Sequence, residues 1–222
     1  MSKLVKTVIA ASVATVALGS GVAMAEVSAN IGATSNYIWR GLTQTDDQAA
    51  ISGGLDYEAA SGFYLGTWAS NLDGGNYELD LYAGFSGEAG SIGYDLGAIH
   101  YAYPIGDDEL DFTELYGSLG FGPVTGSVAY TVDSEAGGDD SDLYYSLSGD
   151  IPLKEDLFVG VLAGRYDFDA ADAEDYTHFQ LALTKSAAEF GDFTFAVDKT
   201  DLDEGSLDDP RVSVSWNKSL DL

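Results

Sequence analysis

The sequence contains no cysteine, so no disulfide bond can stabilise the fold, and packing and hydrogen bonding must do so. Basic residues are also scarce, with nine Lys and Arg against 37 Asp and Glu among 222 residues. This excess of negative charge argues against nucleic acid as a partner, because that binding depends on Lys and Arg neutralising phosphates. It does not predict disorder, because 45% of the residues are hydrophobic.

Long apolar runs are absent except at the N-terminus. There, two lysines precede an apolar stretch over residues 7–22, and Ala23-Met24-Ala25 follows as an A-x-A cleavage pattern. We therefore expect residues 1–25 to be a cleaved secretory signal peptide and residues 26–222 to form one exported domain. Without the signal peptide, seven basic residues remain against 37 acidic ones. No second run of 18 or more apolar residues follows, so we expect no membrane-spanning helix.

The rest of the chain alternates between apolar and polar residues with a period of two. In residues 77–86, YELDLYAGFS, odd positions are apolar, and even positions are mostly acidic or small. A helix cannot give this split, because its faces recur every three or four residues. Antiparallel strands are therefore expected. Twelve segments show the pattern: 27–41, 49–58, 63–71, 77–87, 91–103, 110–121, 124–133, 142–151, 157–167, 176–185, 192–200 and 211–222.

The connections between these segments alternate between two kinds. One kind is acidic and mostly longer, at 43–48, 72–76, 104–109, 134–141, 168–175 and 201–210. The other is short and less charged, at 59–62, 88–90, 122–123, 152–156 and 186–191. In an up-and-down array, successive connections lie at opposite ends, so one end collects the acidic loops. Long loops at one end and short turns at the other are typical of outer-membrane barrels.

The alternation and the loop asymmetry together predict an all-β fold, a closed antiparallel up-and-down transmembrane β-barrel of about 12 strands. Closure leaves no strand edge unpaired, which lipid requires because it cannot hydrogen-bond a bare backbone. Aromatic residues near the strand ends, such as Tyr37 and Trp39 near the acidic rim, are expected to form belts facing the lipid interface. An even strand number predicts that both termini lie in the periplasm of a Gram-negative cell.

A series of aromatic and glycine motifs runs through the first half of the chain. It includes Ser35-x-Tyr37-x-Trp39-Arg40-Gly41, Glu78-x-Asp80-x-Tyr82-x-Gly84 and Tyr101-x-Tyr103-Pro104, and it is densest over residues 26–121. The series resembles a proteobacterial family of porin-like proteins, the TorF type. The resemblance implies a barrel in the cell outer membrane, and it transfers no catalytic or ligand-binding residue.

Charged residues on the polar face are the candidates for lining a pore. They are expected to favour cations, because carboxylates along a narrow channel raise the local cation concentration. The alternative is a narrow lumen plugged by fixed pairs, in which Arg40 binds an acid of a neighbouring strand. The candidates are Arg40, Asp56, Glu78, Asp80, Asp95, Glu114, Asp150 and Asp198.

Aromatic residues on the same polar face could stack a sugar or an aromatic solute. Equally, they could fill space and hydrogen-bond to inward acids. These residues are Tyr64, Trp68, Tyr82, Tyr101, Tyr116 and Tyr144.

The acidic loops, including 107–109 and 139–140, could hold divalent cations against lipopolysaccharide phosphates, or they could be a solvated rim. No segment matches the twelve-residue calcium loop, and we expect neither a metal site nor a cofactor. A serine phospholipase would need a serine beside His100 or His178, and no motif places one there. The G-x-S-x-G, H-E-x-x-H and glycine-rich phosphate-loop motifs are absent, so we expect no enzyme.

The functional hypothesis is an outer-membrane porin for passive diffusion of small hydrophilic solutes, with a preference for cations. The alternative is a non-conducting barrel with a structural or surface-binding role, and a third hypothesis is a lipid-modifying enzyme. The expected partners are outer-membrane lipid and lipopolysaccharide, the solutes or cations, and the barrel-assembly machinery. The sequence defines neither the solute nor an oligomeric state.

Overall fold

The computed structural model describes residues 25–105, 110–135, 141–170, 173–203, 206–207 and 209–222. The predicted signal peptide therefore lies outside the described residues, apart from Ala25. The acidic stretches 107–109 and 139–140 also lie outside them, so their predicted cation binding stays a prediction.

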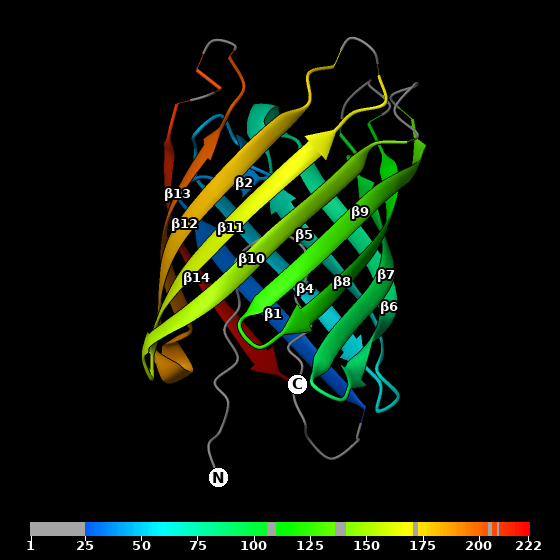
Figure 1. The fold of residues 1–222 in the computed structure, drawn as a ribbon, viewed down its shortest axis with the longest axis vertical. Helices are drawn as coiled ribbons and strands as arrows, with labels where there is room; N and C mark the ends of the chain where they lie inside the picture. Colours follow the sequence, from blue (N-terminus) through cyan, green and yellow to red (C-terminus); the bar gives the residue numbers. More distant parts are fainter. Residues whose placement is uncertain (1–24, 106–109, 136–140, 171–172, 204–205, 208) are drawn as a thin grey trace.

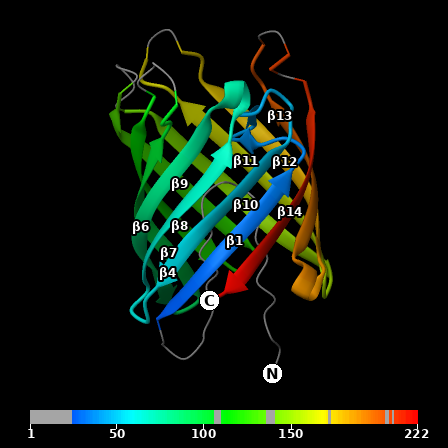
Figure 2. The ribbon, with the colours of Figure 1, turned by 180° about the vertical axis from the view of Figure 1, so that it is seen from behind.

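Twelve strands of the described chain form one closed antiparallel barrel (Figures 1 and 2). Each strand pairs with its neighbours along the chain, and β1 closes the barrel by pairing with both β14 and β4. This confirms the predicted fold class. The strands are β1 (Glu26–Thr34), β4 (Ala50–Glu58), β5 (Phe63–Asn71), β6 (Tyr77–Ala89), β7 (Ile92–Ala102), β8 (Phe112–Phe121), β9 (Val124–Ser134), β10 (Leu143–Lys154), β11 (Leu157–Asp167), β12 (Tyr176–Ser186), β13 (Asp192–Thr200) and β14 (Arg211–Asp221).

The two kinds of connection lie at opposite ends of the barrel, as the sequence predicts. The short turns share one end with the start of β1 and the end of β14, at the bottom of Figure 1. We call this end the turn end and the opposite one the loop end. Two 3₁₀ turns occur in connections, η1 (Asp73–Gly75) at the loop end and η2 (Ala188–Phe190) at the turn end. No helix of the described residues is both long enough and apolar enough to cross a membrane.

The outer face of the barrel is apolar, because the odd positions of strands such as β6 point outward. Leu81 and Phe85 are both more than half exposed, whereas Glu78, Asp80 and Tyr82 on the same strand are buried inside. Exposed apolar residues recur on every strand of the wall. A continuous apolar exterior around a polar interior is the arrangement that lipid requires of a spanning barrel.

The inner wall is packed by tyrosine rings that lie over glycines of the neighbouring strand. Tyr64 on β5 pairs with Gly84 on β6, and Tyr116 on β8 pairs with Gly97 on β7. A Cβ added to Gly97 would lie 2.5 Å from the ring of Tyr116 and 2.8 Å from a backbone carbonyl oxygen. Glycine is therefore required where these rings cross the wall.

The predicted strand over residues 27–41 is wrong beyond Thr34. The chain leaves the wall there and forms a separate two-stranded hairpin from β2 (Ile38–Trp39) and β3 (Leu42–Thr43). Arg40 and Gly41 connect these strands, with φ angles of 48° and 86°. Two successive positive φ angles are typical of a type I′ turn, whose twist matches that of a tight hairpin. The period-two pattern of residues 37–41 is therefore real but belongs to this hairpin.

Candidate functional site

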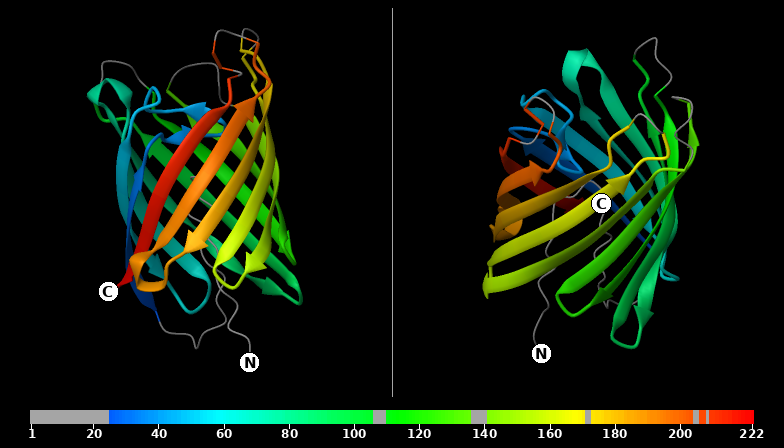
Figure 3. Two further views of the ribbon diagram at one scale, coloured as in Figure 1. Left: turned by 90° about the vertical axis from the view of Figure 1, so that its left-hand side faces the viewer. Right: turned by 45° about the horizontal axis from the view of Figure 1, so that its top comes forward.

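The hairpin of residues 36–45, which we call the inner hairpin, folds into the barrel instead of projecting from it. Figure 3 shows this blue segment within the loop end of the barrel. Tyr37 is only 6% exposed, and the Trp39 ring packs against residues of the inner wall. The predicted lipid-facing position of Tyr37 and Trp39 is therefore wrong. A short hairpin strand alternates like a wall strand, so the pattern does not distinguish the two.

The tip of the inner hairpin is held by a buried ion pair. The Arg40 guanidinium donates two hydrogen bonds to the two carboxylate oxygens of Glu114 on β8, at 2.8 and 2.7 Å. The two side chains are 5% and 2% exposed. The guanidinium carbon also lies 4.1 Å from the ring centre of Trp39 and 4.2 Å from that of Tyr144 on β10. Arg40 thus lies in the lumen beside an acid, as expected for a fixed pair. The expected position of that acid on a neighbouring strand is wrong, because Glu114 lies on β8, four strands from β4, and is reached only by the hairpin crossing the lumen.

Other contacts of the tip reach several strands across the barrel. The Trp39 ring packs edge-on against Tyr101 of β7 and Tyr166 of β11, with ring centres 5.9 and 6.1 Å apart. At Gly41, an added Cβ would lie 2.6 Å from the Cβ of His178 on β12. The inner hairpin begins at β1 and ends at β4, which lie opposite β9 and β10 in the strand order. It therefore crosses the lumen from one wall to the other.

The base of the inner hairpin is bound to the near wall. The Tyr37 hydroxyl donates to Glu78 of β6 at 2.7 Å, and the Tyr103 hydroxyl donates to the second oxygen of Glu78 at 2.9 Å. The Tyr37 ring meets Trp68 of β5 edge-on, with ring centres 5.5 Å apart. Within the hairpin, Asn36 accepts hydrogen bonds from two threonine hydroxyls. These contacts hold the base of the hairpin, and the Arg40–Glu114 pair holds its tip.

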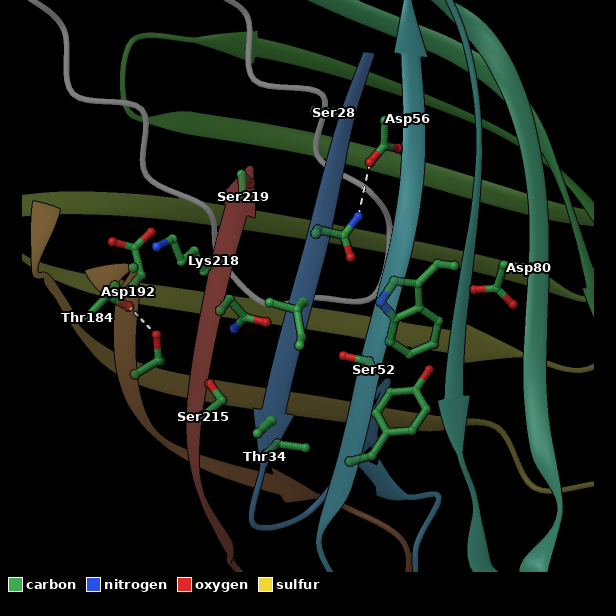
Figure 4. Close-up of a pocket in the computed structure, with 18 of the residues that line it drawn as sticks. Ser28, Thr34, Ser52, Asp56, Asp80, Thr184, Asp192, Ser215, Lys218 and Ser219 are labelled. Carbon is green, nitrogen blue, oxygen red and sulfur yellow. Dashed lines mark hydrogen bonds between the residues drawn. The ribbon is translucent and has the colours of Figure 1, made fainter. Parts of the chain in front are cut away.

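A cavity of about 660 Å³ lies between the inner hairpin and the turn end. Figure 4 shows part of its lining, with Asp56 and Asp80 on one side and Asp192 and Lys218 on the other. Hairpin residues Asn36, Tyr37 and Ile38 border it on the loop side. Of the described residues that line it, eight are acidic and one, Lys218, is basic. The acidic ones are Glu26, Asp56, Glu58, Asp80, Glu189, Asp192, Asp198 and Asp221.

The predicted pore-lining residues divide into two groups. Asp56, Asp80 and Asp198 line the cavity. The others do not: Arg40, Glu78 and Glu114 hold the inner hairpin, Asp95 accepts a hydrogen bond from Tyr64 at 2.6 Å, and Asp150 is partly buried outside the lining. The structure thus brings three candidates together and assigns three more to fixing the hairpin.

The predicted stacking residues divide in the same way. Tyr64, Trp68 and Tyr82 line the cavity. The inner hairpin covers Tyr101 and Tyr144, through Trp39 and Arg40 respectively. The Tyr116 hydroxyl lies 2.5 Å from that of Tyr64, within the wall packing. A solute in the cavity could therefore reach the first three rings.

Most interior carboxylates have partners, but two in the cavity have a bare oxygen. Asp56 accepts hydrogen bonds from Asn30, at 3.0 Å, and from Tyr82. Asp80 is 4% exposed, and its Oδ1 has no hydrogen-bond partner among the described residues. Asp198 is 2% exposed; its Oδ1 accepts from Gln180 at 2.9 Å, whereas its Oδ2 has no partner in the same part of the chain.

Each histidine lies within hydrogen-bond distance of a hydroxyl group. The Nε2 of His178 lies 3.0 Å from the Tyr144 hydroxyl inside the barrel. The Nδ1 of His100 lies 3.0 Å from the Thr113 hydroxyl, and its Nε2 lies 3.9 Å from a carboxylate oxygen of Asp111. None of these partners is a serine, and the described residues contain no group of three His, Asp or Glu that could hold a metal ion.

Comparisons with known proteins agree with this architecture. A family model described as "Bacterial protein of unknown function (Gcw_chp)" matches residues 19–213. No protein of curated function matches the sequence. Among solved structures, the KdgM porin is similar with a TM-score of 0.59 and 8% identity, over 86% of this chain and 97% of the porin. The same porin in complex with disordered oligogalacturonate gives 0.58 and 6% identity, over 88% and 98%.

An outer membrane channel from Pseudomonas putida F1 is also similar, with a TM-score of 0.54 and 11% identity, over 91% of this chain and 97% of the channel. At such low identities these likenesses concern the fold. They support a porin-like barrel, and the narrower TorF-type resemblance is not confirmed by them.

Proposed function

The chain belongs to the Gcw_chp family, whose function is not established, and we propose that it is an outer-membrane channel for small hydrophilic cations. The observation that carries the proposal is the lining of the cavity, with eight carboxylates and one lysine among the described residues. Carboxylates facing a confined aqueous space concentrate cations and repel anions. Passive diffusion through such a space requires no catalytic residue.

The proposed location is the outer membrane, with the turn end in the periplasm. The apolar exterior of the barrel and the similarity in fold to a porin and an outer membrane channel support it. Acidic residues of the loop end, such as Asp169, Asp175 and Asp203, would then face outward. Cations would enter the cavity from the periplasm, where Glu26, Glu58 and Asp221 line its rim.

The inner hairpin lies across the proposed path. It contacts the near wall, where Tyr37 meets Trp68 of β5, and the far wall, where Arg40 lies over the ring of Tyr144 of β10. This observation favours a second candidate function, a barrel that does not conduct while the hairpin is in place. In that case the protein would have a structural or surface-binding role, or it would conduct only after the hairpin moves.

Conductance of the purified protein in planar bilayers tests the proposal. Under a KCl gradient we expect channels whose reversal potential indicates cation preference. Asp80→Asn with Asp198→Asn should reduce that preference, because both residues line the cavity. The control, Glu88→Gln with Glu155→Gln, removes the same charge from exposed positions at the turn end that do not line the cavity, and it should leave the preference unchanged.

A second variant separates the two candidate functions. Replacing residues 36–48 with a short Gly-Ser linker removes the inner hairpin while β1 and β4 can still pair. Channels in this variant alone would identify the native barrel as closed. Anion preference in the native protein, or no channels in either protein, would overturn the cation channel.

A further inference from the structure

Some carboxylate oxygens in the cavity have hydrogen-bond partners and others have none among the described residues, and this difference points to a ligand. We propose that the cavity binds small organic ammonium ions, with Asp80 and Asp198 as the counter-charges. The inference rests on the proposed function, because a channel would admit the ligand from solution. It extends that function by naming the class of solute. Binding can be measured separately from conduction, because the cavity lies on the turn side of the inner hairpin.

Asp80 and Asp198 are exceptions among the interior acids. A buried carboxylate is costly unless it is paired or hydrogen-bonded. Four other interior acids meet this condition, because their carboxylates accept hydrogen bonds from Arg, Tyr or Asn side chains: Asp56, Glu78, Asp95 and Glu114. Asp80 and Asp198 are both more buried than Asp56 and Asp95, yet each has an oxygen without a partner among the residues described. A cation bound beside each of them would neutralise the carboxylate.

The wall next to Asp80 suits an organic cation. Trp68 is the cross-strand partner of Asp80, and Trp68 and Tyr82 both line the cavity beside it. An ammonium ion with alkyl groups gains from aromatic faces as well as from a carboxylate. A volume of about 660 Å³ is within the usual range for small-molecule sites.

A bare metal ion fits this site less well. Calcium takes six to eight oxygen ligands, and magnesium requires near-octahedral geometry. Asp80 and Asp198 come from β6 and β13, which are five strands apart around the barrel, and no metal-binding group of three acids or histidines occurs in the described chain. An ammonium ion needs only one carboxylate and apolar contact. An anion would be repelled by the eight acidic residues of the lining.

Titration calorimetry on the protein in detergent tests this inference, with tetramethylammonium and butylammonium as probes. We expect saturable binding to the native protein, whereas tert-butanol, a neutral molecule of similar size, should not bind. Asp80→Asn should weaken the binding by about tenfold or more, because it removes the charge and keeps the shape. Trp68→Leu should weaken the binding of tetramethylammonium by about fivefold to thirtyfold.

The matched control is Asp150→Asn, an inward-facing acid outside the cavity lining, which should leave the affinity within about twofold. Heat-modified mobility in gel electrophoresis establishes that each variant forms the barrel. The inference is overturned if no ammonium probe binds saturably, if Asp80→Asn and Asp198→Asn both bind like the native protein, or if tert-butanol binds equally well. Bilayer recordings without channels, alongside normal binding, would reject the proposed conduction and leave the site in place.

Discussion

Replacing Glu114 with Gln removes the charge that Arg40 faces across the lumen and should loosen the inner hairpin. The native pair has two hydrogen bonds of 2.8 and 2.7 Å, and both side chains are almost fully buried. Gln offers one carbonyl acceptor in place of two charged oxygens. The guanidinium would therefore remain buried with a single neutral acceptor.

The magnitude follows from the burial of the pair. Removing one partner of a buried ion pair costs about 3–5 kcal/mol, because the other charge is left uncompensated. The rings of Trp39, Tyr144 and Tyr166 remain around Arg40 and offset part of this loss. We therefore expect the lower figure, about 3 kcal/mol, which corresponds to a roughly 150-fold larger population with the hairpin released.

Hydrogen–deuterium exchange of residues 36–48 measures this population directly. Their amides include that of Gln44, which donates to the Tyr37 carbonyl at 2.7 Å within the hairpin. Exchange there should be about 150-fold faster in Glu114→Gln, while the amides of β12 and β13 should be unchanged. Asp150→Asn serves as the control variant, because no side-chain hydrogen bond or ion pair joins Asp150 on β10 to the hairpin among the described residues.

Two results would refute this reasoning. Unchanged exchange over residues 36–48 would mean that the ion pair does not hold the hairpin. Equally faster exchange in the hairpin and in all strands would mean that the pair stabilises the whole barrel instead.

Two further predictions concern the wall and an exposed pair. Gly97→Ala should lower the free energy of unfolding by about 1–3 kcal/mol in urea titrations, because the new methyl group would clash with Tyr116 and a backbone oxygen. The control, Gly126→Ala, should be nearly neutral, because an added Cβ there has nothing within 4 Å. Equal losses of stability in the two variants would contradict the packing argument. At the turn end, Lys185 donates to the exposed Asp156 and holds the pKa of Asp156 below its usual value. This stabilisation is present above about pH 4 and is lost as the pH falls through the lowered pKa of Asp156. Lys185→Ala should therefore lower the urea midpoint slightly at pH 7 and not at pH 2. An equal effect at both pH values would contradict this role of the pair.

Much of the barrel could be predicted from the sequence because its information is local. The predicted strands 63–71, 157–167 and 192–200 coincide with β5, β11 and β13. Each face of such a strand meets only lipid or lumen, so one period-two pattern carries both the conformation and the orientation. The inward position of Asp56, Asp80 and Asp198 followed from the same pattern, and the structure places all three at the cavity.

The inner hairpin could not be predicted in this way. Tyr37, Trp39 and Arg40 alternate as a wall strand would, and the Arg40-Gly41 turn was the local signal for a hairpin, since glycine readily takes the positive φ that a type I′ turn requires. The direction of the hairpin depends on partners that lie 41 and 74 residues away, Glu78 for Tyr37 and Glu114 for Arg40.

An all-β, strongly acidic barrel with loops at one end and turns at the other could therefore be inferred from the sequence, because strand alternation and turn composition act over about ten residues. Only the tertiary structure decided that the first connection lies inside the barrel. It also decided that Glu78 and Glu114 hold that connection in place, while Asp80 and Asp198 keep a bare oxygen within the cavity lining. The physical reason is that a buried charge is stabilised only by the groups that surround it, and closure of the barrel brings those groups together from strands distant in the chain.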